Sequence, residues 1–179
     1  SGPPGFASNL GLSYRESDPE DIKAMIAYIR TLAPNTNQVP ARHLNFPLNL
    51  VVRMMPREAE PGKRPPATDT VAYGKYLVNL GICGDRHTPT TDRGEPLPGM
   101  ELAGGMEFEM RPPSTGLARA ANITPDVETG IGGWNKAVFI QRFKAYTQIQ
   151  SPAVGKGEAN SSMPWFVYAG MTEEDLGAI

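Results

Sequence analysis

Apolar side chains recur at intervals of three or four residues in several segments, which is the spacing of an amphipathic helix. The segments are residues 19–33, 69–82, 134–146 and 172–179. The first begins at Asp18-Pro19, a capping carboxylate followed by Pro at the first helical position, and it ends before Pro34. Alternation typical of a strand never persists beyond a few residues. The pattern therefore predicts an all-α protein.

The segments between the predicted helices are rich in Pro and Gly, notably residues 56–66 and 89–131. The chain has 19 Gly and 18 Pro in 179 residues, well above the average of roughly 12% for the two together. Loops this long favour a protein that packs around a large, flat cofactor. Gly74 interrupts the second predicted helix, and a Gly in a helix interior usually marks a close approach to another helix.

Charge and cysteine content exclude several functions. The 17 basic and 19 acidic side chains give a net charge of −2, so we expect no nucleic-acid partner, which would require a basic surface. No stretch approaches the roughly 18 apolar residues of a membrane span, so we expect no direct span in this chain. The one Cys excludes an internal disulfide and a zinc site of several Cys residues.

A short internal repeat suggests how the chain is organised. Residues 20–25 (EDIKAM) match residues 174–179 (EDLGAI), and both follow a helix start. We interpret residues 1–34 as the closing helix of a preceding unit, 35–68 as a Pro-rich linker, and 69–179 as the next unit with its last helix truncated. The alternative is two unrelated acidic helix starts.

The repeat makes a prediction about the apolar face of the first helix. A closing helix packs against the first helix of its own unit, so this face should lack its native partner within the present chain. Its side chains are Ile22, Met25, Ile26 and Ile29. If they occupied the groove beside Gly74 instead, the repeat interpretation would be wrong.

The most informative segment begins at Cys83 and ends at Pro89, with the sequence CGDRHTP. Two Cys separated by two residues and followed by His form the signature of covalent haem attachment, in which the thiols bind the porphyrin and the imidazole binds iron. Here Arg86 takes the place of the second Cys. Alone, this incomplete motif is weak, because a single His after a helix is more often a capping or core residue.

The surrounding motifs make the pattern specific. Residues 69–179 resemble a class I c-type cytochrome of the periplasmic mono- or di-haem kind, and specifically its second haem domain. The resemblance rests on four motifs in the correct order. They are YGKYLV at 73–78 before the Cys-x-x-Arg-His segment, ANITPD at 121–126 with ETGIGGW at 128–134, SMPW at 162–165, and YAGMTEEDL at 168–176.

This resemblance implies a fold of class I cytochrome c-like helices and long loops around one haem. His87 would be the proximal iron ligand and Met163 the sixth ligand, with Met171 as second candidate. Cys83 would form the single thioether bond to haem c. A thioether opposite imidazole favours reduced iron and raises the reduction potential.

Four further residues acquire roles from the resemblance. Asn122 and Trp134 would border the haem, although roles in a turn and in the core are equally compatible with these residue types. Gly74 and Tyr76 would form the contact between the first helix and the last, at 172–179.

Arg86 departs from the family pattern and keeps an alternative open. Arg cannot form a thioether, and a guanidinium beside haem needs a propionate, a carboxylate or water. The alternative is a haem-free cytochrome-like scaffold or interaction subunit. A third interpretation makes Cys83 and His87 a catalytic thiol and base, but no orienting group or oxyanion site accompanies them.

The function that follows is electron transfer without substrate chemistry, because iron bound on both faces has no open position. We therefore expect an electron carrier and not an enzyme, serving as an accessory cytochrome of a larger redox complex. Its partners would be redox proteins or a membrane-bound redox complex. Its location would be periplasmic or otherwise extracytoplasmic, as in the cytochromes that it resembles.

Overall fold

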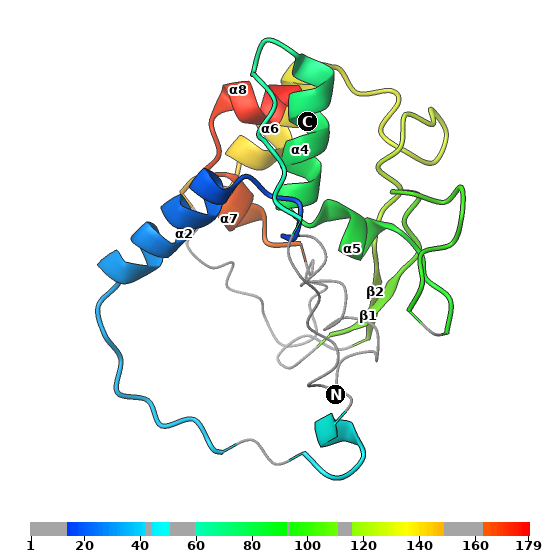
Figure 1. Cartoon of the computed structure of the whole chain (residues 1–179). Coiled ribbons are helices and arrows are strands. Elements are labelled where there is room, and N and C mark those ends of the chain that lie inside the picture. Colours follow the sequence, from blue (N-terminus) through cyan, green and yellow to red (C-terminus); the bar gives the residue numbers. More distant parts are fainter. Residues whose placement is uncertain (1–13, 42–43, 51–59, 93, 111–115, 149–162) are drawn as a thin grey trace. The chain divides into compact units, whose positions relative to one another are not determined.

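The computed structural model describes residues 14–41, 44–50, 60–92, 94–110, 116–148 and 163–179. The chain divides into two compact units, and the boundary between them in the sequence falls between Arg64 and Pro65. Figure 1 shows the elements of both units. Residues 1–13 of the predicted preceding unit lie outside the described residues, as does Ser162 of the SMPW motif.

The amino-terminal unit contains helix α2 (Pro19–Thr31). Asp18 caps it by accepting a hydrogen bond from the Glu20 amide, and Pro19 stands in its first turn, as the sequence predicts. Arg64 holds the start of this helix, because its amide donates to the Asp18 carboxylate and its guanidinium pairs with Asp21 at 2.9 Å. Part of the predicted linker therefore packs against the helix that it follows.

The second unit begins with α4 (Thr70–Leu80), which Asp69 caps through the Ala72 amide at 3.1 Å. The short helix α5 (Cys83–His87) comes next, and the described residues then form α6 (Lys136–Lys144), α7 (Trp165–Tyr168) and α8 (Glu173–Ala178). The side chains of Asn135 and Thr172 cap α6 and α8. A helix thus lies in each of the four segments where periodicity predicts one.

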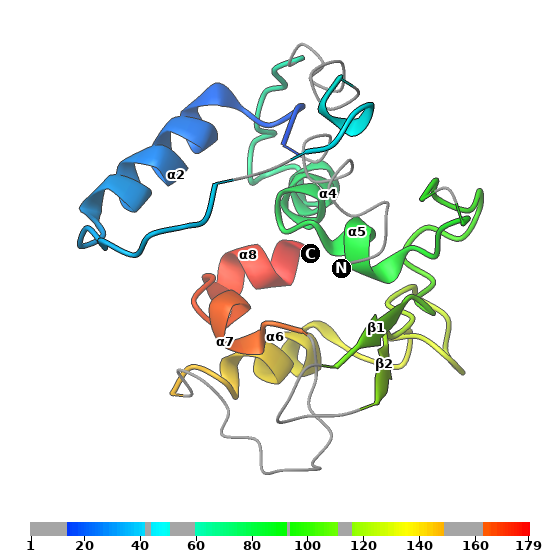
Figure 2. The ribbon, with the colours of Figure 1, turned by 90° about the horizontal axis from the view of Figure 1, so that it is seen from below.

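Helix α8 contacts both α4 and α6 (Figures 1 and 2). Among the described residues, the buried apolar side chains are Leu77, Ile140, Ala169 and Leu176. A Cβ atom on Gly74 would lie 1.9 Å from the Ala178 carbonyl oxygen, so α4 and α8 can approach only because position 74 is Gly. The predicted close helix approach at Gly74 is confirmed, and α8 fills the groove beside it.

The sequence pattern gave no indication of the two-stranded antiparallel sheet of β1 (Glu107–Glu109) and β2 (Leu117–Arg119). Each strand has only three residues, too few for alternation to be recognised. Glu107 pairs with Arg119 across the strands, and an ion pair of 2.7 Å joins their side chains. The second unit is thus helical with one small sheet, and a cytochrome c-like fold stays a prediction.

Candidate functional site

Cys83 and His87 are the first and last residues of the short helix α5 (Cys83–His87). Helix α4 ends at Gly81, and Ile82 has a left-handed backbone with φ of 49°. The sequence predicts a helix over residues 69–82, and the left-handed turn at Ile82 ends it there and directs α5 along a new axis. The two predicted haem-binding residues therefore lie one helical turn apart on one element.

His87 has a defined orientation because both its side chain and its backbone are held by loops. The Nδ1 atom lies 2.8 Å from the backbone carbonyl oxygen of Ala121. A carbonyl oxygen only accepts hydrogen bonds, so Nδ1 must carry a proton, and in the neutral ring the lone pair is then on Nε2. This is the tautomer that a metal-binding imidazole needs, with its second nitrogen fixed by a backbone acceptor.

Gly104 joins the loops that surround His87. Its amide donates to the His87 carbonyl at 2.6 Å, and its φ of 77° suits only Gly without strain. A Cβ atom there would lie 2.5 Å from the backbone of Ala121 and Asn122. Gly104 and Ala121 are residues that the sequence did not single out, since a backbone acceptor has no residue signature. The Gly104-Gly105 pair was the available signal.

Cys83 is partly buried, and its Sγ atom would lie 3.4 Å from a Cβ on Gly81. Burial disfavours the thiolate and raises the pKa of the Cys83 thiol to about 11. A nucleophilic cysteine has its pKa lowered instead, by a cation or a helix N-terminus. The environment therefore argues against the catalytic thiol interpretation.

Arg86 lies on α5 between the two predicted haem-binding residues. Its guanidinium carbon is 5.3 Å from the centre of the Phe108 ring, within the range of a cation–π interaction. Phe108 belongs to β1, so the unpredicted sheet supplies an aromatic surface for the unusual residue of the motif.

Met163 lies two residues before the short helix α7 (Trp165–Tyr168), whose N-cap is Pro164, and its carbonyl oxygen accepts a hydrogen bond from the Trp165 amide at 2.9 Å. The Trp165 ring packs on α6 and its following turn, with ring centres 5.3 Å from Phe143 and 5.5 Å from Tyr146. Lys144 donates hydrogen bonds to the carbonyls of Ala169 and of Met171, the second candidate ligand. The Met163 segment is thus anchored to α6.

Asn122 follows the carbonyl that orients His87, and its side chain organises the loop. Its Oδ1 accepts hydrogen bonds from the amide and hydroxyl of Thr124, and its Nδ2 donates to Thr129 at 2.9 Å. These contacts give Asn122 a turn-forming role beside His87. A contact between Asn122 and haem stays a prediction.

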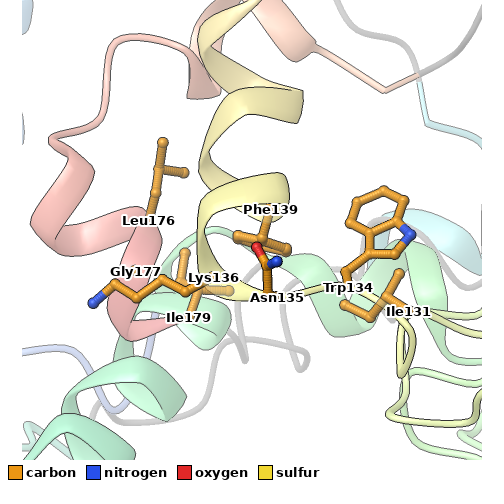
Figure 3. A pocket seen from close by; sticks show the side chains of 8 residues that line it. All are labelled: Ile131, Trp134, Asn135, Lys136, Phe139, Leu176, Gly177 and Ile179. Atoms are coloured by element: carbon orange, nitrogen blue, oxygen red, sulfur yellow. The ribbon is translucent and has the colours of Figure 1, made fainter.

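Trp134 lines a shallow pocket between α6, α8 and the preceding loop (Figure 3). Trp134 and Ile131 lie on one side of the pocket and Leu176 on the other. Its volume of about 150 Å³ is below the roughly 300–1,000 Å³ of typical cofactor sites. This pocket is too small for haem, and the predicted contact of Trp134 with haem stays a prediction.

The residue types fit haem better than a metal ion alone. Among the described residues, no group of three or more His, Cys, Asp and Glu side chains could hold a metal. Cytochromes c hold their iron with an imidazole and a Met thioether, residue types that His87 and Met163 supply, and the Cys83 thiol on the helix of His87 is the group that could attach a macrocycle. No helix in the described part of the chain is long and apolar enough to cross a membrane.

Comparison with known proteins adds one finding. No family model matches the chain. It is 30% identical to the cytochrome subunit of fructose dehydrogenase from Gluconobacter japonicus in an alignment of 152 positions that covers 80% of this chain. The chain spans about 30% of the length of that relative. This similarity supports a relationship between the chain and the cytochromes.

Proposed function

We propose that residues 69–179 form a class I cytochrome c-like domain that carries electrons on one haem c. The observation that carries this proposal is the hydrogen bond of 2.8 Å between His87 Nδ1 and the Ala121 carbonyl, one helical turn from Cys83. It fixes the tautomer whose Nε2 can bind iron. The similarity to a cytochrome subunit supports the same function.

His87 and Met163 would hold the iron on its two faces, and Cys83 would form one thioether bond to the macrocycle. When bound, the haem supplies reversible one-electron oxidation and reduction of its iron. The protein's contribution is to orient His87 through Ala121 and Gly104, and to keep the Cys83 thiol in an apolar environment. With His87 and Met163 both holding the iron, no position would remain open to a substrate, so the domain would be an electron carrier and not an enzyme.

The partners follow from the relative's name, which identifies a subunit of a dehydrogenase. We extend this to the present chain as an accessory cytochrome of a redox complex, receiving electrons from one protein and passing them to another. The domain would work in the periplasm or another extracytoplasmic space, where c-type haem is attached in the proteins that the chain resembles. Residues 1–34 would be the closing helix of a preceding unit of the same kind.

The test is to produce the chain together with a c-type haem attachment system and record its absorption spectrum. We expect a Soret band, sharp reduced bands and one haem that stays with the protein in acidified solvent. Cys83→Ala should make that haem extractable, and His87→Ala should abolish the low-spin spectrum. Met100→Leu serves as a matched control for Met163→Leu, which alone should remove the thioether ligand. A wild-type chain without a Soret band would contradict the proposal.

A second function is favoured by one observation, the packing of the Arg86 guanidinium over Phe108. Here the position of the second thioether is occupied by a charged side chain with its own aromatic surface. A haem-free scaffold of a redox complex would retain such packing without a cofactor. Substituting Arg86→Cys discriminates between the two functions. A second thioether, measured as a haem-peptide mass, supports the electron carrier, and a protein that still binds no haem supports the scaffold.

A further inference from the structure

The hydroxyl of Tyr168 donates a hydrogen bond of 2.7 Å to the carbonyl oxygen of Gly81. Both residues are partly buried, and they are 87 positions apart in the chain. Gly81 ends α4, so its carbonyl is among those that a helix end leaves without an intrahelical donor. A distant side chain has taken the place of a local cap.

The two ends of this bond lie close to two predicted haem-binding residues. Gly81 is two residues before Cys83, and both the Cys83 Sγ atom and the Tyr168 ring lie against Gly81. They are 3.4 and 3.6 Å from the position that a Cβ atom would take. The Tyr168 ring therefore covers the turn from which Cys83 projects.

On the other side, Tyr168 is joined to Met163 through the backbone of α7. The Met163 carbonyl accepts from the Trp165 amide, and the Pro164 carbonyl accepts from the amides of Val167 and Tyr168 at 3.0 and 3.3 Å. Because these hydrogen bonds fix the backbone of residues 163–168, we expect the segment to move as a rigid unit. A contact made by Tyr168 is thus transmitted to Met163.

The other contacts of the segment that contains Met163 and α7 are made with α6 and the turn after it. Trp165 packs on Phe143 and Tyr146, with the Arg142 guanidinium 4.8 Å from its ring centre, and Lys144 binds the Ala169 carbonyl. All of these hold α7 to α6 and its following turn. The Tyr168 ring also packs edge-on against Phe143 of α6, with ring centres 6.2 Å apart, but its hydroxyl connects α7 to the segment of Cys83.

We propose that Tyr168 is a positioning residue that holds the Met163 segment at a fixed place relative to the Cys83 and His87 segment. The inference rests on the proposed function, because it concerns how the sixth ligand is kept on the iron. If Met163 leaves the iron, α7 must shift and the hydroxyl must give up the Gly81 carbonyl. The hydrogen bond therefore opposes ligand loss.

The experiment titrates the oxidised, haem-loaded full chain with imidazole, which competes with Met163 for iron, and follows the long-wavelength thioether–iron absorption band. Tyr168→Phe keeps the ring and removes the hydroxyl. We expect imidazole to bind about three- to tenfold more tightly to this variant, the value of one hydrogen bond. The haem content and the thioether bond should not change. Tyr146→Phe is the matched control and should bind imidazole as the wild type does.

A second measurement uses the wild-type protein, in case Tyr168→Phe does not fold. Amide hydrogen exchange is compared with and without saturating imidazole. Peptides covering residues 163–169 and 77–84 should lose protection together, because opening one end of the bond releases the other. Loss of protection in 163–169 alone would overturn the inference.

The remaining outcomes separate the two proposals. If wild type and Tyr168→Phe bind imidazole equally, with the variant only less stable to heat, Tyr168 has a purely structural role and the inference is wrong while the electron-carrier function stands. A wild-type chain that carries no haem overturns both.

Discussion

The Gly104 amide lies 2.6 Å from the His87 carbonyl oxygen, and the site where a Gly104 Cβ would stand is filled by the backbone of Ala121 and Asn122. One glycine therefore holds the backbone of His87 against the loop whose carbonyl orients the imidazole. The arrangement depends on φ of 77°, which other residues adopt only with strain.

Gly104→Ala should disrupt this junction. The added Cβ would lie 2.5 Å from backbone atoms that cannot move independently, so we expect a loss of roughly 2–4 kcal/mol in the free energy of unfolding, as for other overpacked sites. Urea unfolding measures the change. Gly105→Ala is the matched control, because its φ of 87° is also positive but its Cβ would meet nothing within 4 Å. It should lose only about 1–2 kcal/mol. Equal losses would contradict the crowding argument.

Gly74→Ala should separate α4 from α8. Its Cβ would lie 1.9 Å from the Ala178 carbonyl oxygen, and relieving this overlap would expose Leu176, which is now 1% exposed. We expect a destabilisation of about 3 kcal/mol or more, measured by thermal or urea unfolding. Gly133→Ala, which meets nothing within 4 Å, should change stability by less than about 1 kcal/mol. If Gly74→Ala left the free energy of unfolding unchanged, α4 and α8 would have to be farther apart than the contact between Gly74 and Ala178 indicates.

The Cys83 thiol predicts a pH dependence of stability in the haem-free protein. Its pKa is raised from 9.0 to about 11 by burial. Below pH 9 the thiol is neutral in both the folded and the unfolded chain, so Cys83 makes its full contribution to the free energy of unfolding. Between 9 and 11 the unfolded chain ionises first, so the free energy of unfolding falls, by roughly 2–3 kcal/mol in total. The measurement is urea unfolding across this range, taken as the difference from Cys83→Ala. In the haem-attached protein the thioether does not titrate, so this difference should vanish.

Lys144→Met should loosen the turn after α7. The Lys144 ammonium donates to the carbonyls of Ala169 and Met171, and Ala169 is 1% exposed. Removing the ammonium group leaves the partly buried carbonyls of Ala169 and Met171 without this hydrogen-bond donor, which should lower the free energy of unfolding by about 1–3 kcal/mol. Lys75→Met replaces an exposed lysine and should stay within about 0.5 kcal/mol of wild type. If the two variants were equally stable, the turn would not depend on Lys144.

The sequence by itself determined the helices of this protein, because caps and periodicity are local properties. Asp18 caps the helix that it predicts, and Asp69 and Thr172 cap helices that begin where periodicity predicts them. It also indicated the close approach at Gly74, since a Gly in a helix interior needs a reason, and the Cys83 and His87 pair through the motif that they share with c-type cytochromes.

Only the tertiary structure decided what surrounds that pair. The Ala121 carbonyl, the Gly104 junction and the Tyr168 bond to Gly81 join residues far apart in the chain. All three contacts use a backbone carbonyl as the acceptor, which no residue pattern in the sequence can indicate. The sequence also could not predict the left-handed backbone of Ile82, because a β-branched residue disfavours that conformation. Nor could it predict strands of three residues, which are too short for alternation to be recognised. Both features depend on packing between residues that are far apart in the sequence, which forms only when the whole chain has folded.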